Sequence, residues 1–197
     1  LIEAITEDPW LHYGGIIGVH SRKDAQRVDN LPRETNVVTM IRRGEFVETF
    51  FRVLFIVHQN RQILFQRDMQ LDFFGTIHGS FEMDNDHYNA RTYASLISNF
   101  LFNSNYVDLE MRDRLHVALF EMIMNAIEHG NCGITYDEKN EYLQRYGDII
   151  PLIREKCLDP ELKRRRVAVT YRITPERSKF EIEDEGEGFD WRSRLSD

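Results

Sequence analysis

The strongest constraint on the fold of this chain is an apolar run, LHVALFEMIMNAIEHG, at residues 115 to 130. Its apolar residues recur at helical spacing, which predicts a core-forming helix over residues 109 to 129. Two polar residues, Glu121 and Asn125, stand inside the run, so we expect both side chains to be at least partly buried. A buried carboxylate without a partner is costly, and so we expect something to compensate it.

Glu121 and Asn125 are four residues apart and therefore share one face of the predicted helix. Glu128 and His129 continue this polar stripe at the next turn. A buried polar pair bonded to neighbouring backbone is one interpretation of the stripe. A carboxylate and an amide together in so apolar a run favour the other interpretation, which is a binding or catalytic site.

A second feature is the segment EIEDEGEGFD at residues 181 to 190, with six carboxylates, two glycines and no lysine or arginine. As a strand it turns Phe180 and Ile182 to one face, and Asp184 follows them on that inward face. The intervening residues, which we expect to be solvated, are Glu181, Glu183 and Glu185.

Two glycines, Gly186 and Gly188, follow Asp184 and allow backbone to approach a ligand closely. An inward carboxylate beside such a turn suits a base that carries an exocyclic amine, such as adenine. A calcium EF-hand is not supported, because its twelfth position requires a bidentate glutamate and is Arg192 here. The GxxxxGK[ST] pattern of a P-loop does not occur in the sequence.

Hydrophobic periodicity along the rest of the chain alternates between strands and helices, which predicts an α/β fold. The expected N-terminal elements are a helix within residues 1 to 12, strands at 14 to 21 and 36 to 41, and a helix from 45 to 61. The expected later elements are a strand at 76 to 83, a helix at 88 to 102, the core helix, a helix near 137 to 157, and strands at 166 to 173 and 178 to 184.

The helix expected from 45 to 61 carries an apolar stripe. This stripe consists of Val47, Phe50, Leu54 and Val57 at spacings of three and four residues. We expect the stripe to pack on the protein's own sheet, and a dimerising helix, which would make a homodimer, is the alternative interpretation.

The net charge of -8 argues against nucleic acid or an anionic membrane as the main partner, because both attract basic surfaces. The longest apolar run, residues 53 to 57, is far shorter than the roughly 20 residues of a membrane span. Cys132 and Cys157 show no zinc spacing and no CxxC motif, so two free thiols in a cytoplasmic protein are expected.

The two polar segments together match a known pattern. ExxxNAxEHG on a helix, followed by a strand and DxGxGF, resembles the GHKL ATPase superfamily, in its branch of anti-sigma factors and serine-protein kinases. The resemblance covers residues 76 to 197 and implies a two-layer α/β sandwich with a mixed sheet. It places an ATP-binding domain at residues 67 to 197, without the lid and second glycine box that follow Phe189 in that family.

This resemblance also implies roles for individual residues. Glu121 would be the catalytic carboxylate, Asn125 a ligand of magnesium, and Asp184 the residue that holds adenine. Further positions placed beside ATP are Glu128, His129, Gly186, Gly188 and Phe189.

Residues 1 to 66 resemble the second half of a response-regulator receiver domain, which has a flavodoxin-like α/β fold. LIEAITEDPWLHYGGIIGVHS is similar to the family's third helix and fourth strand, and NVVTMIRRGEFVETFFRVLFIV to its fifth strand and fifth helix. Arg42-Arg43 stands where that family usually has Lys-Pro.

The function that these resemblances imply is an ATP- and magnesium-dependent serine/threonine kinase that phosphorylates a protein partner, either a sigma-like factor or an antagonist. A non-catalytic module that sequesters its partner is the first alternative. The catalytic domain of a sensor histidine kinase is the second, and it is disfavoured because HQNRQI at His58 lacks the pattern of a phosphoacceptor helix.

Overall fold

A computed structural model describes residues 4–5, 7–8, 11, 14–29, 31, 35–60 and 76–188 of the chain. The helix predicted within residues 1 to 12 lies mostly outside these residues. The predicted domain boundary between residues 66 and 67 and the predicted ligand contact at Phe189 lie entirely outside them. Among the described residues, no helix combines the length and apolar character that crossing a membrane requires.

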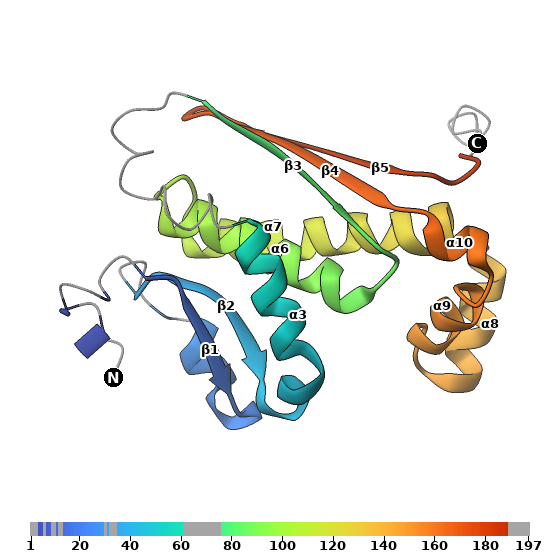
Figure 1. The fold of residues 1–197 in the computed structure, drawn as a ribbon, viewed down its shortest axis with the longest axis horizontal. Helices are drawn as coiled ribbons and strands as arrows, with labels where there is room; N and C mark the ends of the chain where they lie inside the picture. The colour runs from blue at the N-terminus through green and yellow to red at the C-terminus, as the bar shows by residue number, and fades with distance from the viewer. Residues whose placement is uncertain are drawn as a thin grey trace. The chain divides into compact units, whose positions relative to one another are not determined.

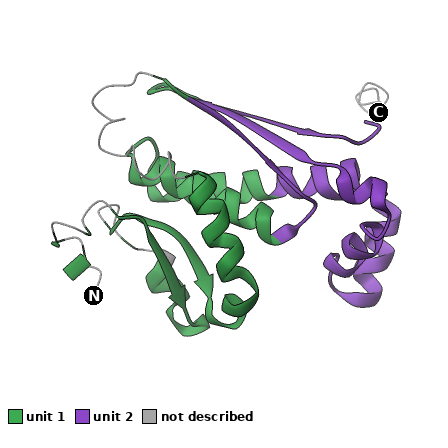
Figure 2. Ribbon diagram, in the orientation of Figure 1, with its two compact units in different colours: residues 1–77, 88–120, 173–178 green, residues 78–87, 121–172, 179–197 purple. Residues whose placement is uncertain are grey.

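Two compact units divide the chain, and their segments alternate along the sequence (Figure 2). Unit 1 consists of Leu1–Ile77, Tyr88–Phe120 and Ile173–Ser178, and unit 2 of His78–His87, Glu121–Arg172 and Lys179–Asp197. One sheet has parallel strands and the other antiparallel strands, so the predicted α/β class with mixed strand directions is confirmed (Figure 1).

The sheet of unit 1 pairs strand β1 (Ile16–His20) with strand β2 (Val37–Arg42) in parallel, close to the predicted positions. The connection contains two short helices, η1 (Arg22–Asp24) and α2 (Ala25–Asp29), which the sequence does not predict because they are too short to show periodicity.

Helix α6 (His87–Asn103) is held to β2 by its amide side chains. Asn99 and Asn103 donate from Nδ2 to the carbonyls of Val38 and Val37 at 3.0 and 3.1 Å.

Helix α3 (Phe46–Gln59) follows β2 as predicted, but it buries a different face. Its buried side chains are Thr49, Val53 and Ile56, whereas Val47 is 87% exposed and Leu54 44% exposed. The prediction that the stripe of Val47, Phe50, Leu54 and Val57 packs on the sheet is therefore wrong. Apolar residues occupy most of the circumference of this helix, and so periodicity alone could not select the buried side.

This assignment of faces predicts opposite outcomes for two valines of α3. Val53→Ala should lower the free energy of unfolding by about 1–3 kcal/mol, because it removes two buried methyl groups and leaves a cavity. Val47→Ala should change the free energy of unfolding by less than about 0.5 kcal/mol. Urea denaturation of both variants measures the difference. A larger loss of unfolding free energy in Val47→Ala than in Val53→Ala would show that Val47 lies on the buried face.

The second sheet has the order β3 (Ile77–Met83), β4 (Val167–Ile173) and β5 (Ser178–Asp184), and neighbouring strands run in opposite directions (Figure 1). All three strands lie where the sequence predicts them. A tight turn joins β4 to β5, in which the Thr174 amide donates to the carbonyl of Arg177 at 2.9 Å. Asp184 is the last residue of β5 and lies at the end of the sheet.

The predicted core helix forms as α7 (Leu109–Asn125), but its last turns become a π-helical segment, η4 (Ala126–Asn131). A π-helical turn changes which side chains share a face, and such turns are frequent at functional sites. The residues of η4 therefore do not continue the face that carries Glu121 and Asn125.

The single helix predicted near residues 137 to 157 is wrong. The structure has α8 (Tyr136–Tyr146), α9 (Ile150–Lys156) and α10 (Pro160–Arg164) in this region. Gly147 ends α8 with a positive φ of 74°, a conformation that glycine adopts without steric cost. The side chain of Asp148 then accepts a hydrogen bond from the Ile150 amide at 3.0 Å, which starts α9.

Candidate functional site

The first half of the candidate site is the face of α7 that carries Glu121 and Asn125. Both residues are exposed, so the expectation that they are at least partly buried is wrong. Met122 is also 48% exposed, whereas Ile123 is fully buried. The apolar run therefore has a solvent side, and the two polar residues lie on it.

Exposure leaves the two side chains available to a ligand. No hydrogen bond or ion pair within the described part of the chain occupies Glu121 or Asn125. An amide oxygen is a hard ligand of the type that magnesium accepts. No group of three or more His, Cys, Asp or Glu residues is gathered into a metal cluster in the described ranges. A magnesium ion here would therefore take most of its ligands from phosphate and water, which is usual for that ion.

Glu128 and His129, on η4, contact the start of α8 and the loop before it. The Glu128 side chain is buried and its Oε2 lies 2.5 Å from the Lys139 ammonium of α8. The His129 ring donates from Nδ1 to the Ile134 carbonyl at 2.6 Å and stacks on Tyr136 at 4.5 Å between centroids. Both residues thus hold the start of α8 against η4. Their predicted contact with ATP stays a prediction.

The second half of the candidate site is the end of β5, where the predicted alternation of faces is confirmed. Asp184 is half-buried, in line with Phe180 and Ile182. Its Oδ1 accepts a hydrogen bond from the Gly186 amide at 2.9 Å, which closes a short turn. The exposed residues of the alternate face are Glu181, Glu183 and Glu185.

Two glycines bring the halves into contact. A Cβ atom on Gly130 would overlap the carboxylate of Asp184, and a Cβ atom on Gly186 would overlap the backbone of Gly130. Both positions therefore require glycine for close approach of two chain segments. Gly188, two residues later, has a positive φ of 71° and is exposed. The helix motif and the strand motif thus meet at Gly130, Asp184 and Gly186.

A residue that the sequence did not single out, Asn131, holds this junction together. Its side chain is fully buried; Oδ1 accepts from the Glu185 amide at 2.8 Å, and Nδ2 donates to Asn85 Oδ1 at 2.8 Å. Its carbonyl accepts from the Arg165 guanidinium at 2.9 Å. Asn131 therefore joins η4 to the turn after β5 and to the loop after β3. Asparagine is frequent in loops, and nothing in the local pattern marked this one.

Basic residues of the run from 163 to 166 also contact the junction. Besides the bond from Arg165, the Arg166 amide donates to Glu185 Oε2 at 2.7 Å. The Arg166 side chain donates to the carbonyls of three preceding residues, at 3.0 to 3.2 Å. These two arginines thus stabilise the end of α10 and the turn after β5.

No protein family, curated protein sequence or solved structure matches this chain. The interpretation of the site therefore depends on its own residues and their geometry.

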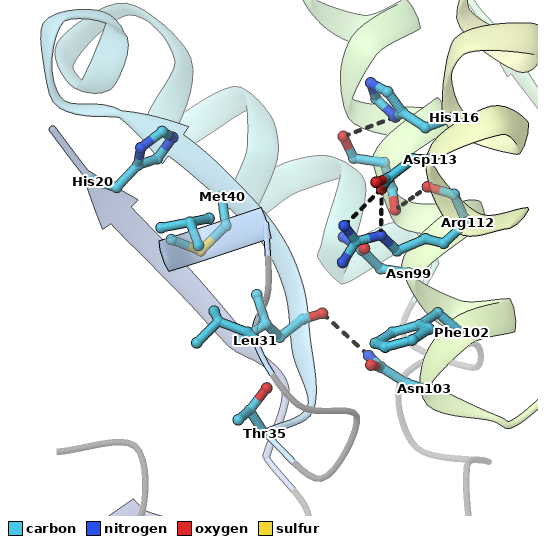
Figure 3. A pocket seen from close by; sticks show the side chains of 14 residues that line it. His20, Leu31, Thr35, Met40, Asn99, Phe102, Asn103, Arg112, Asp113 and His116 are labelled. Atoms are coloured by element: carbon cyan, nitrogen blue, oxygen red, sulfur yellow. Dashed lines mark hydrogen bonds and ion pairs between the residues drawn. The ribbon is translucent and has the colours of Figure 1, made fainter. Parts of the chain in front are cut away.

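Unit 1 contains a separate cavity of about 170 Å³ that holds none of the predicted site residues (Figure 3). His20 and Met40 line it from the strands, and Asn99, Arg112 and His116 from the helices. Arg112 is paired with Asp113, with its Nε and Nη2 at 2.9 and 2.6 Å from Oδ1. Burial lowers the pKa of His116 below its usual value. With its arginine paired to a carboxylate, this cavity offers little free positive charge to a phosphate.

Proposed function

We propose that this chain is an ATP-dependent regulatory protein of the GHKL type, in the branch of anti-sigma factors and serine-protein kinases, and that it phosphorylates a partner protein. One observation carries the proposal. The helix motif ends at Gly130 and the strand motif begins at Asp184, 54 residues later. The two meet so closely that neither Gly130 nor Gly186 has room for a Cβ atom, and Asp184 lies against Gly130. Two motifs that form one site must converge in this way.

The arrangement of secondary structure supports the same proposal. Unit 2 combines most of a three-stranded antiparallel sheet with the end of α7, as expected for part of a two-layer α/β sandwich. In unit 1, the parallel pair β1–β2 followed by α3 supports a partial receiver-like segment over residues 1 to 66.

Each site residue has a distinct chemical role in this proposal. Asp184 accepts a hydrogen bond from the adenine amine through Oδ2, because Oδ1 already accepts from the Gly186 amide. Asn125 offers its amide oxygen to magnesium. Glu121, one helical turn earlier, takes the proton from the serine or threonine hydroxyl of the partner. Bound magnesium supplies the positive charge that phosphoryl transfer requires.

Calorimetric titration of Mg-ATP into the chain and into Asp184→Asn tests the proposal. Asparagine retains an oxygen acceptor for the Gly186 amide, but it presents an NH₂ donor where the adenine amine needs an acceptor. We therefore expect the binding free energy to weaken by about 1–3 kcal/mol, or roughly 5- to 150-fold in Kd.

Glu183→Gln is the matched control, because Glu183 is exposed on the opposite face of the same strand. It removes the same charge at the residue next to Asp184 but on the exposed face, and we expect it to leave the affinity nearly unchanged. Equal losses in the two variants would mean that general charge, not a specific hydrogen bond, affects binding. Unchanged affinity in Asp184→Asn would remove Asp184 from the site.

A further inference from the structure

The two cysteines of the chain, 25 residues apart in sequence, lie side by side in unit 2. The Cys132 and Cys157 sulfur atoms are 4.0 Å apart. Cys132 directly follows η4, with its amide bonded to the Ile127 carbonyl at 2.8 Å, and Cys157 directly follows α9, with its amide bonded to the Ile153 carbonyl at 2.9 Å. Both thiols are free, and the sequence spacing alone did not predict their contact.

The environments of the two thiols differ. Cys132 is 2% exposed, and burial, together with the neighbouring Cys157, raises its pKa to about 12. Cys157 is only half-buried, so solvent and small solutes can reach it. Since the thiolate is the nucleophile, an oxidant would react first at Cys157, and Cys132 would be the resolving thiol.

We propose that Cys132 and Cys157 form a modification site at which hydrogen peroxide produces an intrachain disulfide. A disulfide needs a sulfur separation of about 2.05 Å, so the sulfur atoms must approach by roughly 2 Å. This displacement is within reach of side-chain rotation and a small adjustment at the end of α9. Formation of this disulfide does not depend on the proposed function.

The chemistry proceeds in two balanced steps. The Cys157 thiolate attacks one peroxide oxygen; the S–O bond forms, the O–O bond breaks, and the departing hydroxide takes a proton to become water. The Cys132 sulfur then attacks the sulfenic sulfur of Cys157; the S–S bond forms, and the S–O bond breaks. The hydroxide leaves with the Cys132 proton as a second water. Two thiols are oxidised and one peroxide is reduced.

The bridge would link α9 to the residue that follows Asn131. Asn131 connects η4 with the turn after β5. Oxidation would therefore restrict the movement of the segment in which Gly130 contacts Asp184. A cross-link compatible with the native fold restricts the unfolded chain, so we expect the melting temperature to rise on oxidation and to return on reduction.

The test treats the folded chain with hydrogen peroxide and maps its peptides by mass spectrometry without reduction. We expect one cross-linked peptide containing Cys132 and Cys157, a loss of two hydrogen atoms from the monomer, and reversal by dithiothreitol. In Cys132→Ala, which retains a small buried side chain, dimedone should trap a sulfenic acid at Cys157. In Cys157→Ser, Cys132 should remain reduced.

Three results would overturn this inference: two free thiols after treatment of the unsubstituted chain, cross-links only between separate chains, or a melting temperature that falls when the bridge forms. Each of these readouts is independent of nucleotide. A failure here would therefore leave the ATP proposal intact, and a failure of ATP binding would leave this inference intact.

Discussion

Glu121→Gln is expected to slow transfer of the γ-phosphoryl group of ATP by about 10²–10⁴-fold, the usual contribution of a general base, while Mg-ATP affinity is retained. Glutamine has nearly the size of glutamate but cannot take a proton from a hydroxyl. Glu121 is exposed, so the substitution should not change the stability of the fold. Release of labelled phosphate, and its incorporation into an added partner protein, at saturating Mg-ATP measures the loss.

Glu110→Gln provides the control on the same helix. Glu110 is exposed and pairs with Arg114 at 2.6 Å near the start of α7, away from the junction in sequence. We expect this variant to retain the full rate of transfer. If Glu121→Gln also retains the full rate, Glu121 is not the base. If the unsubstituted chain binds Mg-ATP but transfers no phosphoryl group, the non-catalytic module that sequesters a partner becomes the better description.

Asn131→Ala should lower the free energy of unfolding by about 2–4 kcal/mol, because it leaves the Glu185 amide and Asn85 Oδ1 without their partner. We also expect Mg-ATP affinity to fall, since the turn after β5 loses its attachment to η4. Denaturant unfolding and calorimetry of the same variant measure the two effects.

Asn140→Ala is the matched control, because Asn140 is exposed on α8 and alanine favours a helix. We expect Asn140→Ala to leave both stability and affinity essentially unchanged. If the free energy of unfolding of Asn131→Ala lies within about 0.5 kcal/mol of that of the unsubstituted chain, the junction does not depend on this hydrogen-bond network.

The order of the main elements could be predicted from the sequence because each has a clear local period. The strand at residues 178 to 184 illustrates this: alternation along it predicted both the half-buried position of Asp184 and the exposure of its neighbours, and the structure confirms both. The glycines after Asp184 were predicted to let backbone approach a ligand closely. In the structure, Gly186 instead allows the close approach of another chain segment, the backbone of Gly130.

Local periodicity failed where burial depends on tertiary contacts. Glu121 and Asn125 were expected to be at least partly buried because apolar residues surround them in sequence, yet they lie on the solvent side of α7. In α3, apolar residues lie on most sides, and contacts in the fold selected Val53 and Ile56 for burial. A helical period identifies a helix, but it identifies the buried face only when the opposite face is polar.

Other features were beyond prediction because they join segments that are distant in sequence. Asn131 has partners 46 and 54 residues away, and helices α8 and α9 lie between the two cysteines. The transition from α7 to the π-helical η4 also has no simple sequence signal. Because of this transition, the Glu128 side chain is buried and pairs with Lys139, and it does not lie beside Asn125.

Backbone amide shifts in an NMR titration with Mg-ATP would locate the nucleotide site residue by residue. We expect saturable changes to concentrate at residues 125 to 131 and 184 to 188, where the two motifs meet. Changes confined to the unit 1 cavity around His20 and His116, or no changes at millimolar Mg-ATP, would contradict this expectation.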